Sequence, residues 1–159
     1  MKKAEDKTNA VRLLEQKRLT FTLHTYAPDR ALSGQEVAAV LGQDPETVFK
    51  TLVTVGRSGG HYVFMVPVCH ELDLKKAAAA VGEKSIAMIK DKELLPLTGY
   101  IHGGCSPIGM KKAFPTVIDE TAQLFDAILF SGGRIGLQVE MSVGELAGAL
   151  SFKLADITG

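Results

Sequence analysis

The sequence has no tryptophan, only two cysteines, no excess of either charge and no long apolar run. Its 18 Lys and Arg balance 18 Asp and Glu, which argues against a protein that binds nucleic acid mainly through electrostatic attraction. No apolar stretch approaches the roughly 18 residues that a membrane-spanning helix needs. The amino terminus also lacks the apolar core of a signal peptide. We therefore expect a cytoplasmic protein.

The two cysteines, Cys69 and Cys105, are far apart and match no metal-ligand spacing. In a reducing compartment they are expected to stay thiols. Cys69 ends the apolar run VFMVPVC, which predicts a buried structural role for it. The sequence therefore predicts no metal site and no cofactor.

A chain of 159 residues with 46% hydrophobic residues is expected to form one domain, residues 1–159, around a single core. Ser33 and Glu36 have capping-box spacing, as do Ser142 and Glu145. Asp73 is a further helix cap, and Asp44 with Pro45 predicts another helix start, within DPETVF at 44–49. Periodicity predicts helices at 8–18, 33–42, 74–82, 91–95 and 142–150, and strands at 21–26, 50–55, 61–68, 99–103, 116–120, 127–131 and 135–140.

Several successive strands are separated by too few residues for a helical crossover. The sheet must then be mixed and largely antiparallel, which favours an α+β domain with short helices beside the sheet. A dinucleotide-binding fold is disfavoured, because GGRIG at 132–136 is followed by the strand pattern LQVEM rather than by a helix.

The glycine-rich stretch GGCSPIGMKK at 103–112 contains two residues that could act as nucleophiles. Cys105 would need a base, and His102 is near in sequence but lacks an acid to orient it. Ser106 precedes Pro107, which favours an extended backbone at the serine and does not fit a nucleophile elbow. The pattern favours neither residue as a nucleophile.

Glycines 103, 104 and 109 would instead let the backbone come close to a ligand, although a plain connection between strands has the same composition. A second glycine loop, SGGRIG at 131–136, adds open backbone and suggests a shared cleft. Lys50 begins an apolar strand, where it is either a strand-edge lysine or a cation at the mouth of a pocket that binds a phosphate or an anionic transition state.

Five motifs in this order resemble the YbaK/EbsC family of aminoacyl-tRNA deacylases, which is related to the editing domain of bacterial prolyl-tRNA synthetases. The resemblance covers nearly the whole chain. The motifs are HTY at 24–26, VFKTL at 48–52, LDLKK at 72–76, TGY with GGCSPIG at 98–109, and SGG before GL at 131–137.

This resemblance implies a mixed α+β fold with a closed, barrel-like sheet, and a deacylase that removes the amino acid from mischarged tRNA, with Cys-tRNA(Pro) as the expected substrate. Lys50 and Gly103 match the residues expected to act in catalysis. The residues expected to bind the substrate are Tyr26, Thr51, Gly104, Ser106, Ser131 and Gly132. Because the chain is neutral, prolyl-tRNA synthetase is expected to recruit it to tRNA in a transient complex.

The sequence departs from the family pattern at several positions, and these departures bear on which amino acid the enzyme removes. Cys105 stands where an aliphatic residue is usual, Gln138 where an aspartate is expected, and Ile135 where an arginine is expected. Ser33 replaces a bulky aromatic residue. Two other classes remain open: a module that binds a nucleotide or an aminoacyl-adenosine without turnover, and a cysteine hydrolase that uses Cys105 and His102.

Overall fold

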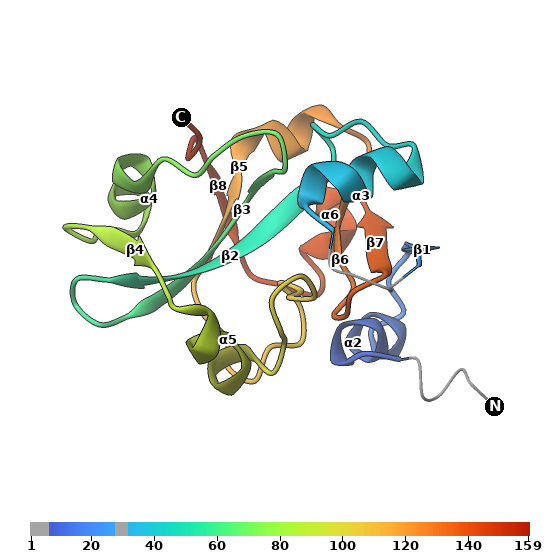
Figure 1. Cartoon of the computed structure of the whole chain (residues 1–159), viewed down its shortest axis with the longest axis horizontal. Helices are drawn as coiled ribbons and strands as arrows, with labels where there is room; N and C mark the ends of the chain where they lie inside the picture. Colours follow the sequence, from blue (N-terminus) through green and yellow to red (C-terminus); the bar gives the residue numbers. More distant parts are fainter. Residues whose placement is uncertain (1–6, 28–31) are drawn as a thin grey trace.

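The computed structural model describes residues 7–27 and 32–159, and within these ranges eight strands form two sheets (Figure 1). The first sheet has the order β1-β7-β6 and is antiparallel throughout, and the second has the order β4-β2-β3-β5-β8. The strands are β1 (Thr22–Thr25), β2 (Phe49–Gly56), β3 (His61–Pro67), β4 (Ile86–Met88), β5 (Thr116–Asp119), β6 (Ile128–Ser131), β7 (Leu137–Met141) and β8 (Lys153–Ala155).

The described residues also contain five α-helices and one short 3-10 helix. They are α2 (Asn9–Gln16), α3 (Gly34–Leu41), α4 (Leu74–Val81), α5 (Asp91–Thr98), α6 (Val143–Leu146) and the 3-10 helix η1 (Glu120–Leu124). None of these helices is long and apolar enough to cross a bilayer.

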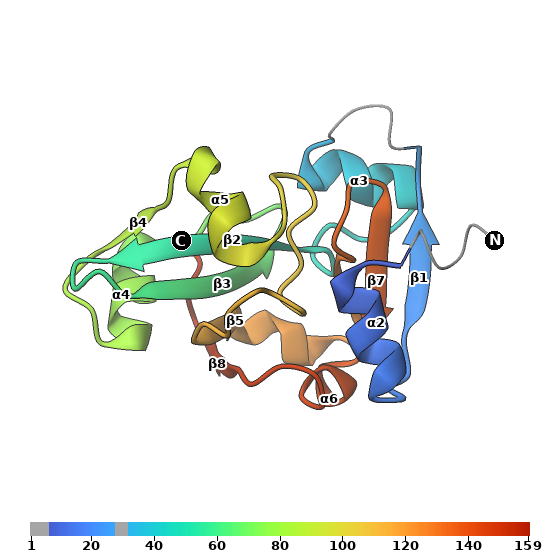
Figure 2. The same cartoon turned by 90° about the horizontal axis from the view of Figure 1, so that it is seen from below.

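The long β2–β3 hairpin forms the central part of the larger sheet. Figure 2 shows that this hairpin extends away from the smaller sheet and that α5 lies against it. Gly59, with a φ of 95°, provides the turn that the RSGG pattern predicts. Strands β3, β5 and β8 are parallel, whereas the other pairs are antiparallel. The α+β class with a mixed, largely antiparallel sheet is therefore confirmed.

The predicted caps are present at three helices. Ser33 and Glu36 close a full capping box at α3, and Asp73 accepts hydrogen bonds from two backbone amides of α4. At α6 the Ser142 hydroxyl accepts from the Glu145 amide, but the Glu145 carboxylate accepts from the amide of Thr20 instead of closing the box. The cap therefore also connects α6 to the chain before β1.

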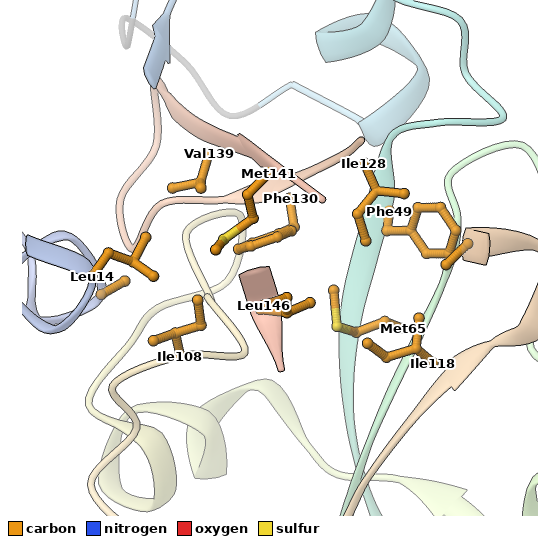
Figure 3. Close-up of a cluster of buried hydrophobic side chains, with 12 residues drawn as sticks. Leu14, Phe49, Met65, Ile108, Ile118, Ile128, Phe130, Val139, Met141 and Leu146 are labelled. Carbon is orange, nitrogen blue, oxygen red and sulfur yellow. The ribbon is translucent and has the colours of Figure 1, made fainter. Parts of the chain in front are cut away.

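The main core fills the space between the two sheets (Figure 3). Phe49 and Met65 enter it from the larger sheet, Phe130 and Val139 from the smaller one, and Leu14 from α2. A parallel bridge between Val48 and Leu129 joins the sheets at this point. This close packing makes the junction between the sheets rigid, so it can hold the residues of a site in a fixed geometry.

Four details of the prediction were wrong. The strands form two open sheets and no closed barrel within the described residues. The 99–103 segment is a turn, and the 44–49 segment is a turn that runs into β2. The helix expected at 142–150 ends at Leu146. Edge strands β4 and β8 are short, so neither has enough alternation to be recognised from sequence.

Candidate functional site

A pocket of about 350 Å³ lies where the two sheets meet. The larger sheet contributes Lys50 and Thr51 from β2, the smaller sheet contributes Ser131 and Gln138, and the glycine loop contributes Gly103. Tyr26 and the first turn of α3 also line it. Of the eight predicted site residues, Tyr26, Lys50, Thr51, Gly103 and Ser131 are brought together here, from four separate stretches of the sequence.

Lys50 lies near the start of β2, paired with Val66 of β3. Its side chain is 28% exposed, and its Nζ lies 3.7 Å from Oε2 of Glu71, whose side chain is 92% exposed. An ion pair with such an exposed partner is weak, because solvent screens it. The ammonium can therefore turn to an anionic ligand without leaving a buried charge unpaired.

The glycine loop is held at both ends. The Tyr100 hydroxyl donates a hydrogen bond of 2.6 Å to the carbonyl of Ile108, and the Ile108 side chain is 1% exposed in the main core. Burial of such a side chain stabilises the loop by about 2 kcal/mol. Gly103 has a φ of 86°, which an L-residue rarely adopts. The loop therefore presents the Gly103 backbone to the pocket in a fixed, left-handed conformation.

The other three predicted site residues, Gly104, Ser106 and Gly132, do not line the pocket. A Cβ on Gly104 would lie 2.9 Å from Cα of Arg134, and one on Gly132 would lie 2.7 Å from Cγ of Leu137. These two glycines allow close packing at the second glycine loop. Ser106 is fully buried, and its hydroxyl accepts from the amide of Ile108 at 3.3 Å. The structure thus suggests structural roles for all three residues.

The second glycine loop positions Ser131 and Tyr26. The Ser131 hydroxyl accepts a hydrogen bond from the Gly133 amide at 3.2 Å. The Tyr26 amide donates to the carbonyl of Gly136 at 3.0 Å. Strand β1 and the loop between β6 and β7 are thereby joined on one side of the pocket.

Two buried oxygens that belong to pocket-lining residues have no hydrogen-bond partner among the described residues: Oγ1 of Thr51 and Oε1 of Gln138. Such groups are uncommon in proteins and cost free energy unless a ligand or water binds them. Gln138 was not among the predicted site residues. In the sequence, Gln138 was noticed only because it departs from the family pattern. In the structure it pairs with Ser131 across β6 and β7, and this pairing explains why it lies beside the pocket.

Cys105 is not activated as a nucleophile. Burial raises the pKa of the Cys105 thiol to about 12, so at neutral pH it stays protonated and is a poor nucleophile. The His102 side chain is 78% exposed, and its Nδ1 lies 3.8 Å from the Asp91 carboxylate. Cys105 packs with Val53, Leu94 and Tyr100 in an apolar cluster. This environment suits a small apolar side chain better than a catalytic thiolate.

Comparison with known proteins gives a consistent set of relatives. The aminoacyl-tRNA editing domain family matches residues 28–149. A candidate Cys-tRNA(Pro)/Cys-tRNA(Cys) deacylase, EbsC of Enterococcus faecalis, is 44% identical over 158 residues, covering 99% of this chain and 96% of EbsC. A proline–tRNA ligase of Pelobacter propionicus is 34% identical over 95 residues, which are 60% of this chain and 16% of the ligase.

Solved structures agree with these relatives. The crystal structure of a candidate trans-editing enzyme for prolyl-tRNA synthetase superimposes with a TM-score of 0.80 at 26% sequence identity. The match covers 96% of this chain and 98% of that one. The similarity therefore extends over nearly the whole fold.

Proposed function

The chain belongs to the aminoacyl-tRNA editing domain family, and on this premise we propose that it is a trans-editing deacylase whose preferred substrate is Cys-tRNA(Pro). The editing domain in this proposal is the whole chain, residues 1–159. The observation that carries the proposal is a pocket that brings together Lys50 and the Gly103 backbone, while burial keeps the Cys105 thiol in its lining protonated.

The proposed chemistry needs no such nucleophile. An aminoacyl ester is already activated, so an enzyme accelerates its cleavage by fixing the ester beside the attacking group and by stabilising the oxyanion. Lys50 binds the terminal adenosine or its phosphate. The amide of Gly104 already donates to the carbonyl of Ile101 at 3.0 Å, so we assign the orienting backbone contact to Gly103. Tyr26, Thr51 and Ser131 then hold the aminoacyl and ribose groups.

With a cysteinyl substrate we propose that the thiol of the substrate attacks its own ester. The sulfur bonds to the carbonyl carbon, the bond from that carbon to the ribose oxygen breaks, and the thiol proton goes to the leaving oxygen. Water then opens the cyclic thioester. Detection of solvent oxygen in the first-formed product, with no cyclic thioester, would instead identify water as the attacking group.

The decisive experiment measures deacylation of a panel of mischarged tRNAs: cysteinyl-, alanyl- and seryl-tRNA(Pro), with prolyl-tRNA(Pro) as the control. We expect the fastest turnover with the cysteinyl ester and almost none with the prolyl ester. Binding of these substrates without turnover of any would show that the pocket is a binding module.

We further propose that the protein works in the cytoplasm and reaches tRNA through a transient complex with prolyl-tRNA synthetase. With no net charge, it can release few counterions from tRNA, so its affinity for free tRNA should be weak and salt-dependent. Addition of prolyl-tRNA synthetase should then increase deacylation at low enzyme concentration. Tight, salt-insensitive binding to bare tRNA would contradict this recruitment.

A further inference from the structure

A second cluster of reactive side chains lies outside the pocket, at the far end of the β2–β3 hairpin from its turn. Glu46 precedes β2, and Cys69 and His70 follow β3. The strands pair Phe49 with Pro67, and the Val68 amide continues this register by donating to the carbonyl of Val48 at 2.8 Å. Continued further, the same register places Glu46 opposite His70.

The three ligand atoms already converge. One ligand atom from each of Glu46, Cys69 and His70 lies within 4.8 Å of the other two. Nε2 of His70 lies 3.0 Å and 3.2 Å from the two oxygens of the Glu46 carboxylate. Tetrahedral zinc, with bonds of about 2.0 to 2.3 Å, holds its ligand atoms roughly 3.3 to 3.7 Å apart. A small closure of the cluster would therefore bring all three into coordination distance.

From this convergence we infer that Glu46, Cys69 and His70 form a binding site for a zinc ion. A thiolate, an imidazole nitrogen and a carboxylate oxygen are the donor types that zinc takes in proteins. The thiolate and the carboxylate together balance the two positive charges of the ion. The Cys69 thiol proton is released to solvent when the sulfur binds, and water completes the tetrahedral coordination.

The electrostatic surroundings favour a cation. A carboxylate oxygen of Glu46 lies within 4.8 Å of the Cys69 sulfur, and the negative charge of Asp44 acts on this sulfur as well. Both carboxylates thus act on the sulfur, and a bound cation would be attracted by the same charges. All three ligands are only half-buried, so an ion can enter from solvent.

This site is separate from the deacylase pocket but lies beside it. None of the three ligands lines the pocket, whereas Val48 and Val68 do. Glu71, the residue after His70, contacts Lys50. Zinc would connect the segment before β2 to the turn after β3, and it would hold the turn that carries Glu71. Its binding does not depend on deacylase activity.

The experiment is zinc titration of the chelator-treated full chain by calorimetry, together with cobalt substitution, in which a thiolate ligand gives a sulfur-to-cobalt absorption band. We expect one zinc per chain, a cobalt–thiolate band and a higher melting temperature with zinc. Loss of groups that only orient a ligand typically weakens metal binding roughly 10- to 100-fold. Each of Glu46→Gln, Cys69→Ser and His70→Asn, which remove a ligand, should therefore weaken it by more than about tenfold.

Two matched controls separate this site from adventitious binding. Cys105→Ala removes the other thiol, and His24→Gln removes a histidine that pairs with Glu140 at 2.7 Å on the smaller sheet. Both should retain the zinc affinity, and Cys105→Ala should retain the cobalt band. No zinc binding by the parent, equal affinity in the three ligand variants, or loss of binding in His24→Gln would each overturn the proposal. If a ligand variant fails to fold by circular dichroism, the cobalt band in Cys105→Ala still decides whether Cys69 binds the metal.

Discussion

The Nζ of Lys50 and the Oε2 of Glu71 lie 3.7 Å apart beside the pocket, and Glu71 is almost entirely exposed. The lysine therefore has a counter-ion in the free protein, but one that solvent screens. The Lys50 ammonium is therefore available to a ligand, unlike a lysine whose ion pair only stabilises the fold.

Replacement of Lys50 by alanine should reduce single-turnover deacylation about a hundredfold or more, because a preorganised charge next to the ester is lost. Glu71→Gln is the matched control, since it removes the same ion pair and leaves the ammonium in place. It should retain near-normal activity. Equal losses in the two variants would show that the ion pair, rather than the cation, is what matters.

Replacement of Gly103 by valine should also abolish most of the activity. The glycine has a φ of 86°, which a β-branched residue resists, and the new side chain would occupy space next to the ester. Gly99 has the same φ of 86° but does not line the pocket, so Gly99→Val measures the backbone strain alone. Similar melting temperatures with activity lost only in Gly103→Val would confirm a role in the site.

Replacement of Cys105 by alanine should leave most of the deacylase activity. At neutral pH the thiol is protonated because burial raises its pKa to about 12. Iodoacetamide should accordingly label Cys69 before Cys105, as read by mass spectrometry of the native protein. A Cys105→Ala variant that folds but has no deacylase activity would instead support a cysteine hydrolase.

The same buried groups predict how stability depends on alkaline pH. Burial raises the pKa of Cys105 from 9.0 and that of Tyr100 from 10.0, both to about 12. Unfolding lets these groups ionise at their ordinary values, so their contribution to stability is complete below pH 9 and is lost as pH rises toward 12. The free energy of unfolding in urea should fall above pH 9, and less steeply in Cys105→Ala. An unchanged slope in that variant would contradict the assignment.

Replacement of Thr51 by valine should separate function from stability. Its buried Oγ1 has no hydrogen-bond partner in the part of the chain that the structure describes, so valine should maintain or raise the melting temperature while reducing kcat/KM about three- to tenfold through loss of a substrate hydrogen bond. Thr54→Val is the control on the same strand. Thr54 donates to the carbonyl of Tyr62 at 2.9 Å, so that variant should lose about 1 kcal/mol of stability and retain activity.

Much of the local structure could be predicted from single stretches of the chain. The capping residues Ser33, Glu36 and Asp73, and the RSGG turn between two apolar strands, act over distances of a few residues, so their effects are visible in the sequence. For Lys50 the sequence left two interpretations open, a strand-edge lysine and a cation beside a pocket, and the structure places it in the pocket lining.

The packing between distant segments was decided only by the tertiary structure. Ser106 and Cys105 sit next to each other in a glycine-rich motif, yet burial makes one a loop support and raises the pKa of the other. Gln138 became a pocket residue because β7 pairs with both β1 and β6. Cys69, predicted to be buried, is instead half-exposed beside Glu46, 23 positions earlier in the sequence.

By itself, the sequence determined the class of fold, the capped helices and the motifs that indicate the family, because these depend on neighbouring residues and their order. The tertiary structure alone decided that the sheets stay open, which glycines line the pocket and which side chains meet at the end of the β2–β3 hairpin. The physical reason is that strand register, burial and desolvation arise from contacts between residues far apart in the chain, and these are made only when the sheets have formed.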